Sequence, residues 1–506
     1  MEASYALRMS EQNQKEKQPL IRLVNRQQMS WRAVDVERLI GEDHRARAIW
    51  MLVGRLDLRR FYENIESSVE EGGRPAIDPQ LLISLWVYAY SQGIGSAREV
   101  ARRCAYDPAF QWLTGLQEVN YHTLADFRVA RQKELDELFT QVLAALSKEG
   151  LITLEQVMQD GTKIKALAST RSYQREGTIR EHLERARQRV AEMGDPRNEE
   201  AGRKVKQAQA RARREQHERL ESALEELQKL QERKSGEKAK SRARVSSSDP
   251  QARVMHHGDG GLSLSYNAQI STDAAQGLIV DVAVTQEAND SAQLLPAVDR
   301  IEQRLERKPQ QMVADGGYTT RDNIEKMAGR GIDFLGSMGR EEMPRGTTAP
   351  HRLPPSAFVY QAETNRYVCP EGQLLRPQGR DNRPNRRGLS TFLYEAKFSD
   401  CQPCHRKPEC CPENRSQGRG ILRFEESGVV QAFREKMASE QAQGQYRRRG
   451  RVVEFCHAWI KSKLGLRQFH VRGLAKVHSE MLWACLTYNL QQWIRLGKLR
   501  AAPAAR

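Results

Sequence analysis

The sequence lacks the apolar runs that place a chain in a membrane. No stretch approaches the roughly 20 consecutive apolar residues of a spanning helix, and residues 1–18 hold no apolar core of a signal peptide. We therefore expect a cytoplasmic protein without membrane partners. Acidic residues are also in short supply, because 65 Asp and Glu face 81 Lys and Arg. The formal net charge of +16 favours a polyanionic partner, since basic side chains displace counterions condensed on phosphates.

Cysteine is scarce and unevenly spread. Five of the eight cysteines lie between Cys369 and Cys411, and in a reducing compartment such clustering favours a metal site over disulfides. Four thiolates would surround a structural Zn²⁺ as a tetrahedron. The predicted ligands are Cys369, Cys401, Cys404 and Cys410, with Cys411 as an alternative to Cys410 and His405 as an alternate ligand. Reduced free thiols and redox-active thiols remain as competing interpretations.

The N-terminal part of the chain, residues 1–150, has the pattern of a helical DNA-binding domain. Ser96 with Glu99 three residues later forms a capping box at the start of one predicted helix. Short helices with small turns and arginines on one of them fit a helix-turn-helix-like module. The arginines that would contact DNA are Arg98, Arg102 and Arg103. The alternative is a helical bundle whose arginines are only solvated.

A polar stretch over residues 171–248 interrupts the pattern that surrounds it. Apolar residues recur there at steps of three and four, first over residues 179–193 and again over residues 220–230. That spacing gives each of two helices a narrow apolar seam, which predicts an antiparallel helical hairpin or a coiled coil with a turn at residues 194–196. The dense charges on the outer faces are those of a solvated surface, or of an arm that grips DNA. Residues 246–250 have the composition of a linker.

Strand patterns flank this stretch. A strand is predicted around residues 156–165, and alternation over residues 262–272 and 278–286, with a turn between them, predicts a hairpin. A helix, a short strand, a second helix and a final strand follow up to residue 338. Because a hairpin comes first and crossover helices come later, the sheet should be mixed. This is the order of a ribonuclease-H-like core, and the predicted fold class is α/β.

The same reading divides the chain into segments. The catalytic core takes residues 151–339 and 441–495, and the helical hairpin is inserted after its first strand. A cysteine-rich insertion, rich also in Pro, Arg and Gly, takes residues 340–440, and a basic tail takes residues 496–506. A length of 506 residues is enough for two to four such units.

Three acidic residues are candidates for chemistry. Asp160 and Asp315 each follow a short apolar run and precede a glycine, the pattern of a carboxylate at the C-terminal tip of a buried strand, and Glu454 opens a helix that carries basic residues. Alone, each has an ordinary explanation as a turn or surface residue. If the strands pair and the helix packs on them, the three can hold two Mg²⁺ (or Mn²⁺) ions roughly 3.5–4 Å apart, as phosphodiester chemistry requires.

The helix of Glu454 carries cations on the same face. Lys461 follows Glu454 by two helical turns, and Tyr446 and Arg449 precede it. Cations beside a metal-binding acid suit a phosphate backbone that crosses the site. The basic surface is extended by Arg467, His470 and Arg472. A basic helix that is merely solvated is the alternative.

Several short motifs together carry a family resemblance. They are IDPQLLISLWVYAYSQGIGSAREVARRC near the N-terminus, QDGTKIKA around Asp160, SYNAQIST, ADGGY around Asp315, and the Tyr, Arg, Glu, Lys pattern of residues 446–461. The chain resembles the bacterial insertion-sequence transposases of the DDE type, within the IS4/IS5-like group, and it is most similar to the IS1182 family. The resemblance extends over nearly the whole chain.

The resemblance implies an activity and its partners. Metal-activated water would cleave the transposon ends, and the freed 3′-OH would attack target DNA. It implies that Asp160, Asp315 and Glu454 bind the metal ions, that Lys461 contacts a phosphate near the scissile bond, and that Tyr446 positions DNA. One partner would be double-stranded DNA, both the terminal inverted repeats and the target, which the protein would bind at the nucleoid. The other partner would be further copies of the chain, in a homodimer or a higher oligomer. The alternatives are a metal-dependent nuclease without strand transfer and a DNA-binding protein that has lost catalysis.

Overall fold

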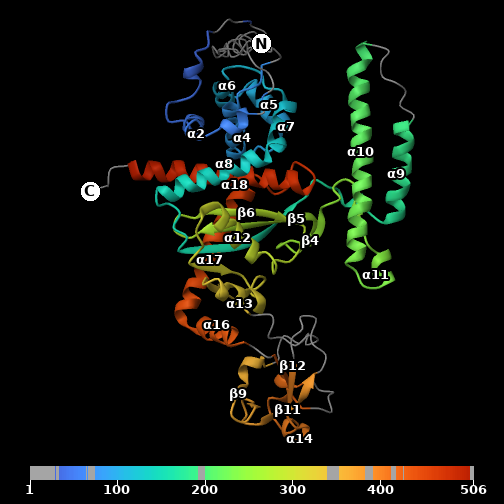
Figure 1. Ribbon diagram of the computed structural model, residues 1–506, viewed down its shortest axis with the longest axis vertical. Coiled ribbons are helices and arrows are strands. Elements are labelled where there is room, and N and C mark those ends of the chain that lie inside the picture. Colours follow the sequence, from blue (N-terminus) through green and yellow to red (C-terminus); the bar gives the residue numbers. More distant parts are fainter. Residues whose placement is uncertain are drawn as a thin grey trace, which may run out of the picture.

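A computed structural model describes residues 33–63, 75–191, 200–338, 353–381, 391–411, 418–424 and 427–501, together with the single residues 29 and 65. These residues form a mixed α/β protein whose parts are stacked along one long axis (Figure 1). A helical N-terminal region lies at one end, a mixed sheet in the middle and a small antiparallel sheet at the other end, and a helical hairpin stands beside the stack. In the part of the chain that the structure describes, no helix is long and apolar enough to cross a membrane.

The N-terminal region is helical, as its composition predicts. Five of its helices begin at a residue whose side chain accepts a hydrogen bond from the first turn: His44, Asp78, Ser96, Asp107 and Asn120. Such caps satisfy backbone N–H groups that the helix itself leaves unpaired. The helices of this region are α2 (Arg45–Val53), α3 (Arg59–Tyr62), α4 (Pro79–Ser91), α5 (Ala97–Cys104), α6 (Pro108–Thr114), α7 (Tyr121–Ala130) and α8 (Gln132–Lys148).

The central sheet confirms the predicted strands and adds one that the sequence pattern did not indicate, β4. Its strands are β1 (Gln156–Lys165), β4 (Arg253–His256), β5 (Leu262–Asp273), β6 (Leu278–Thr285), β7 (Gln311–Ala314) and β8 (Asp333–Gly336). One edge of β5 pairs with β1, and its other edge pairs with β4 and then with β6. On the far side of β1, the strands β7 and β8 continue the sheet in parallel. The sheet is therefore mixed, with a hairpin of β5 and β6 on one side and parallel strands on the other.

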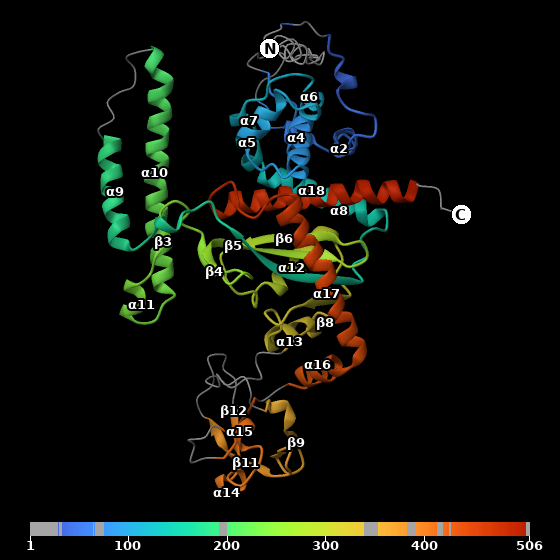
Figure 2. The same cartoon turned by 180° about the vertical axis from the view of Figure 1, so that it is seen from behind.

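Helices cover this sheet. The predicted crossover helices are α12 (Leu294–Leu305) and α13 (Arg321–Gly329). Helix α17 (Glu440–Ala458) crosses the sheet and contacts β1, β5, β7 and β8 (Figure 2), and a π-helical turn at Trp459–Lys463 extends it. Helix α18 (Leu474–Ala501) packs on β6 and also on α4 and α8. The predicted basic tail is therefore helical as far as Ala501, and its last residues lie outside the described part.

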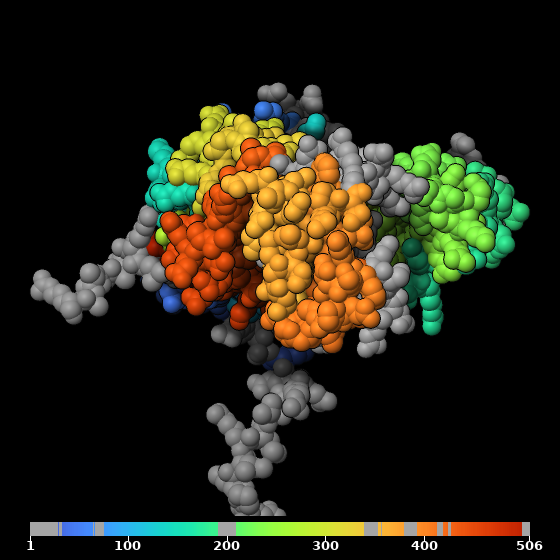
Figure 3. All heavy atoms as spheres, turned by 90° about the horizontal axis from the view of Figure 1, so that it is seen from below, coloured from blue at the N-terminus to red at the C-terminus, as the bar shows by residue number. Residues whose placement is uncertain are grey.

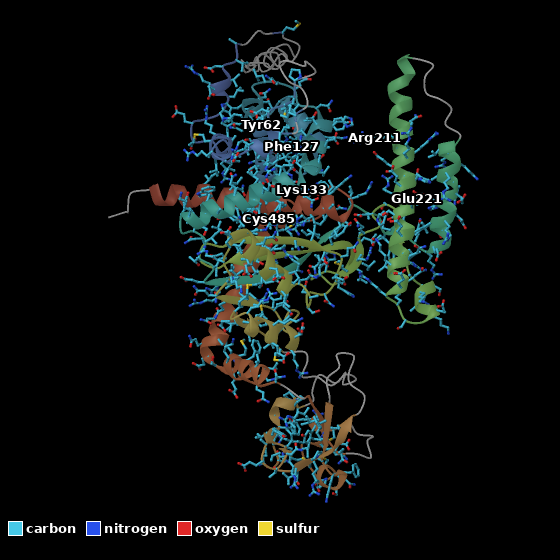
Figure 4. The ribbon with its side chains drawn as sticks, viewed as in Figure 1. Tyr62, Phe127, Lys133, Arg211, Glu221 and Cys485 are labelled. Atoms are coloured by element: carbon cyan, nitrogen blue, oxygen red, sulfur yellow. The ribbon has the colours of Figure 1, made fainter. Side chains whose placement is uncertain are left out.

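The N-terminal helices and the sheet share one apolar core, because α18 lies between them. Phe127 of α7 packs against Trp483 of α18 and against Phe61 of α3. Figure 4 shows Phe127 on the N-terminal side of this layer and Cys485, which is fully buried, within it. Helix α18, which is far along the chain from both regions, therefore joins them in one core.

The polar stretch forms the predicted antiparallel hairpin. Helix α9 (Glu176–Ala191) packs along α10 (Glu200–Glu232), and their seam buries Ile179, Leu183 and Leu227. The expected turn at residues 194–196 lies outside the described residues. Charged side chains cover the outer faces, including Arg211 and Glu221 of α10 (Figure 4). A two-stranded ladder of β2 (Tyr173–Gln174) and β3 (Val245–Ser246) closes the base, next to the short helix α11 (Glu237–Ser241).

The prediction of a linker at residues 246–250 is wrong. Asp249 is fully buried, and its carboxylate accepts hydrogen bonds from the Tyr266 hydroxyl at 2.7 Å and the Gly473 N–H at 3.1 Å. Ser246 is also fully buried. A polar segment without an apolar pattern looks like a linker in sequence, but here Asp249 Oδ1 accepts hydrogen bonds inside the protein and fastens the hairpin to β5 and to the start of α18.

The cysteine-rich insertion folds into a five-stranded antiparallel sheet with a small core of its own. Seen from below, it is the orange body nearest the viewer in Figure 3. Its strands are β9 (Val359–Gln361), β10 (Arg366–Val368), β11 (Leu374–Asp381), β12 (Thr391–Glu395) and β13 (Gly420–Phe424), and its helices are α14 (Phe398–Cys401) and α15 (Lys407–Cys410). Helix α16 (Gly428–Ala438) packs on α13 instead, and Phe433 stacks on Phe334 of β8. Residues 428–438 thus lie with the central sheet, although the sequence reading placed them in the insertion.

Candidate active site

The two aspartates are neighbours because of the register between β1 and β7. Gln159 pairs with Ala314 in parallel, so Asp160 and Asp315 are the next residues on the two strands. The prediction that Asp160 lies at the tip of its strand is wrong, because β1 continues to Lys165 and pairs with β5 along the way. The end of β7 decides the position of the site instead. Beyond Ala314 the chain turns away, and Asp160 is left beside an open edge of β1.

The carboxylate of Asp160 is held at both oxygens. Its Oδ1 accepts the N–H of Gly161 at 2.9 Å, and its Oδ2 forms an ion pair with Arg449 Nη1 at 3.2 Å. The pKa of Asp160 is raised to about 6, chiefly by burial and also by the charges of Asp315 and Asp290, while Arg449 acts in the opposite direction. Three carboxylates therefore repel one another at this place, which favours a bound cation.

Glu454 lies near the end of α17, and the prediction that it opens the helix is wrong. It is exposed, and among the described residues no hydrogen bond or ion pair joins it to Asp160 or Asp315. Arg449 reaches Asp160 from the same helix, and its guanidinium lies 5.7 Å from the ring centre of Tyr446. The structure thus brings Asp160, Asp315 and Arg449 together, with Tyr446 beside them and Glu454 further along α17.

Lys461 lies in the π-helical turn and is half-buried. Burial lowers its pKa, the charges of Arg467 and Lys163 lower it further, and Asp160 acts in the opposite direction. These charges interact with one another only if they lie close together. Lys461 therefore lies near Lys163, Arg467 and Asp160, and its contact with a phosphate stays a prediction.

His470 does not extend this basic surface. Its backbone N–H and its Nδ1 both lie 2.8 Å from the carboxylate of Glu480, which is fully buried. The exposed His470 side chain is therefore already paired with a carboxylate of α18. Arg472 donates to the backbone oxygen of Leu167 at 3.0 Å.

The three N-terminal arginines lie on α5 and have local partners. Arg102 and Arg103 both form ion pairs with Glu99, and Arg103 also pairs with Asp107. The guanidinium of Arg98 lies 5.2 Å from the ring centre of Tyr121. Part of their charge is therefore neutralised within the helix region, and their contact with DNA stays a prediction.

The five clustered cysteines line one small cavity of the insertion. They are free thiols, and the backbone N–H of Gln373 donates to Cys369 Sγ at 3.2 Å. The donor set fits Zn²⁺, which prefers thiolates. Among the described residues, however, no group of three or more His, Cys, Asp or Glu side chains stands in an arrangement ready to hold a metal ion, either here or at the aspartates.

The sequence reading missed Asp290, which lies in the loop between β6 and α12. Its Oδ1 accepts hydrogen bonds from Asn267 and Gln269, both at 2.7 Å, and it contributes to the pKa of Asp160. The only sequence signal was an acidic residue shortly after a predicted strand. Such residues are common in turns, so the pattern did not single it out.

Two segments of the chain match protein-family models. Residues 34–130 match the transposase domain DUF772, and residues 368–494 match the transposase DDE domain. The second match includes α17 with Glu454 and Lys461, and it begins after Asp160 and Asp315. No curated protein matches the chain.

The two transposase domains, in a chain with a helical N-terminal region and a mixed sheet with paired aspartates, imply a DNA transposase. The matches confirm the resemblance to the DDE-type transposases of insertion sequences, and both domains are typical of the IS1182 family. Its partner is therefore DNA.

Proposed function

We propose that this transposase cleaves DNA at the ends of a transposon in a metal-dependent reaction and transfers the freed strand into target DNA. The observation that carries the proposal is the pairing of Gln159 with Ala314, which sets Asp160 and Asp315 side by side. The strand order β6-β5-β1-β7-β8, with the last three strands parallel, supports a ribonuclease-H-like catalytic core.

The donors at this site fit Mg²⁺ or Mn²⁺, because both are hard cations that prefer carboxylate oxygens. In this proposal the ligands are Asp160, Asp315 and Glu454. Two such ions would lower the pKa of the attacking water and stabilise the negative charge on the leaving oxygen. Burial makes the ionised form of Asp160 costly when it stands alone, so this carboxylate gains strongly from a cation.

Arg449 acts on Asp160 rather than on the substrate in this arrangement. Its ion pair lowers the pKa of Asp160 and fixes the direction of the carboxylate. We assign Arg449 a positioning role. It would also contact the DNA backbone once DNA is bound. Lys461, with Lys163 and Arg467 near it, binds a phosphate close to the scissile bond, and Tyr446 positions the DNA.

The remaining DNA contacts and the oligomer complete the proposal. Arg98, Arg102 and Arg103 on α5 would hold the transposon end. Because a transposase must hold two ends at once, the active form would be a homodimer or a higher oligomer. The charged outer faces of α9 and α10 are the candidate interface.

The test uses purified protein, Mg²⁺ and DNA that carries the flanks of the coding region. We expect nicks at defined positions and joined products with a second DNA, both visible on denaturing gels and both abolished by a chelator. Nicks without joined products would favour the nuclease alternative. Bound DNA without nicks would favour the DNA-binding alternative, and failure to bind these flanks would refute the proposal.

We further propose that the insertion holds a structural Zn²⁺ through Cys369, Cys401, Cys404 and either Cys410 or Cys411. The convergence of these thiols on one cavity supports it. We expect about one zinc per chain in protein purified without a chelator.

The variants Cys401→Ser and Cys404→Ser should lose most of this zinc and should melt at a lower temperature than the wild type. The control is Cys104→Ala, which alters a cysteine of α5 and should keep its zinc. Elemental analysis measures the metal. Wild-type protein without zinc, or Cys401→Ser protein with a full complement, would remove the assignment.

A further inference from the structure

Asp290 is held in a fixed orientation by one of its two carboxylate oxygens. Oδ1 accepts the Asn267 and Gln269 amides at 2.7 Å each, and Lys163 Nζ lies 3.4 Å away. The side chain is only 19% exposed. Among the described residues, all three of these contacts fall on Oδ1, and none of the hydrogen bonds falls on Oδ2. One oxygen is therefore anchored, and the other remains available to a ligand.

The anchored carboxylate lies against the glycines that follow the two aspartates. A Cβ atom at Gly161 would come within 2.6 Å of Asp290 Oδ1, and a Cβ atom at Gly317 would lie 3.7 Å from Asp290 Oδ2. The same Gly317 position lies 3.0 Å from Asp315 Oδ1. Gly161 is thus needed for the close approach of Asp290, and Asp290 Oδ2 and Asp315 Oδ1 both lie within 4 Å of the same point beside Gly317.

A second observation also points to a ligand at this place. Asn267 is fully buried, and its Oδ1 has no hydrogen-bond partner among the described residues. Its Nδ2 donates to the Glu287 backbone oxygen and to Asp290, so the orientation of the amide is determined, and Oδ1 lies 3.0 Å from the Cβ position of Gly161. A buried oxygen without a donor is costly. It is the kind of group that a hard cation or its bound water satisfies.

We propose that Asp290 is a fourth carboxylate of the metal site, which binds a divalent cation through Oδ2 together with Asp160 and Asp315. This inference rests on the proposed function, because it assumes that the aspartates hold a metal ion. Four carboxylates would balance the charge of two divalent cations before any phosphate arrives. Among the described residues, no three carboxylates already enclose a cation, so the proposal requires these side chains to draw together as the ion binds. Glu454, which is exposed, is not part of this step.

The experiment measures Mn²⁺ binding to the full chain without DNA, by calorimetry, beside Mg²⁺-dependent cleavage. Asp290→Asn keeps an oxygen for the anchoring amides but loses the charge, and we expect its Mn²⁺ affinity to fall about 10–100-fold, as the loss of a group at a metal site does. Glu454→Gln should change Mn²⁺ affinity less than Asp290→Asn does. The matched control is Glu287→Gln on the same loop, whose carboxylate is exposed and paired with Arg233. It should bind as wild type does.

The outcomes separate this inference from the proposed function. Wild-type protein that binds Mn²⁺ but cuts no DNA would overturn the function, and the Asp290 result would still be decided by binding. If wild-type protein cuts DNA, and the Asp290→Asn variant binds Mn²⁺ and cuts DNA as well as wild type does, only the inference about Asp290 is overturned. Wild-type protein that binds no Mn²⁺ would overturn both. If Asp290→Asn does not fold, Asp290→Glu keeps the charge and moves the carboxylate, and unchanged Mn²⁺ affinity in that variant would overturn the inference.

Discussion

Replacing Asp160 by Asn will lower the rate of strand cleavage at transposon ends by about 1,000-fold or more, because a metal ligand supplies several kcal/mol of the catalytic effect and each 1.36 kcal/mol is a factor of ten. The variant should stay folded. Asn keeps the shape of the side chain and an acceptor for the Gly161 N–H, and it removes the carboxylate repulsion that burial makes costly. Initial rates with Mg²⁺ and end-bearing DNA measure the loss.

Asp315→Asn and Glu454→Gln should lose cleavage to a similar extent. The matched control is Asp299→Asn, which alters an exposed carboxylate of α12 paired with Arg330 and should cut at the wild-type rate. Circular dichroism and melting temperature check the fold of each variant. If all three active-site variants nick DNA as well as wild-type protein does, the assignment of these acids is wrong.

Replacing Glu480 by Ala will lower the free energy of unfolding by about 3–5 kcal/mol, the usual cost of breaking a buried ion pair at one partner. The pair joins Arg128 of α7 to Glu480 of α18 at 3.5 Å, with side chains 5% and 0% exposed. Glu480 also accepts the His470 N–H at 2.8 Å. Without it, the Arg128 guanidinium stays buried over the Trp86 ring with no opposite charge. Denaturant titration measures the change.

A double variant separates the ion pair from simple packing. Arg128→Met with Glu480→Leu should be less destabilised than the sum of the single changes, because no unpaired charge remains buried. The exposed pair Lys326–Asp322 serves as control, and Asp322→Asn should leave stability unchanged within error. A Glu480→Ala protein as stable as wild type would contradict the expected role of this pair.

Local patterns predicted much of the fold. The alternation that ends near Asp273 and resumes at Leu278 indicated the β5–β6 hairpin correctly. The three- and four-residue steps that include Ile179 and Leu227 indicated the seam of α9 and α10. Ser96 marked the beginning of α5. Each of these features depends on residues that are neighbours in the chain, so their spacing carries the information.

Other features depend on contacts across the fold and leave no local trace. The ion pair between Arg449 and Asp160 joins residues from α17 and β1. Asp249 resembles a linker residue until Tyr266 and Gly473 donate to it. Short strands such as β9 and β10 carry too few residues for a periodic pattern, so the sheet of the insertion was not predicted.

The sequence by itself determined which chemical groups this transposase holds: a pair of aspartates that each precede glycine, a glutamate on a basic helix and a cluster of thiols. Residue identity and short-range spacing are enough for that, because carboxylates and thiolates keep their chemistry wherever they lie. Only the tertiary structure decided which groups meet. The register of β1 and β7 joins Asp160 to Asp315, and the loop after β6 adds Asp290. Burial and charge then act through space, so distances in the fold, and not distances along the chain, set the properties of the site.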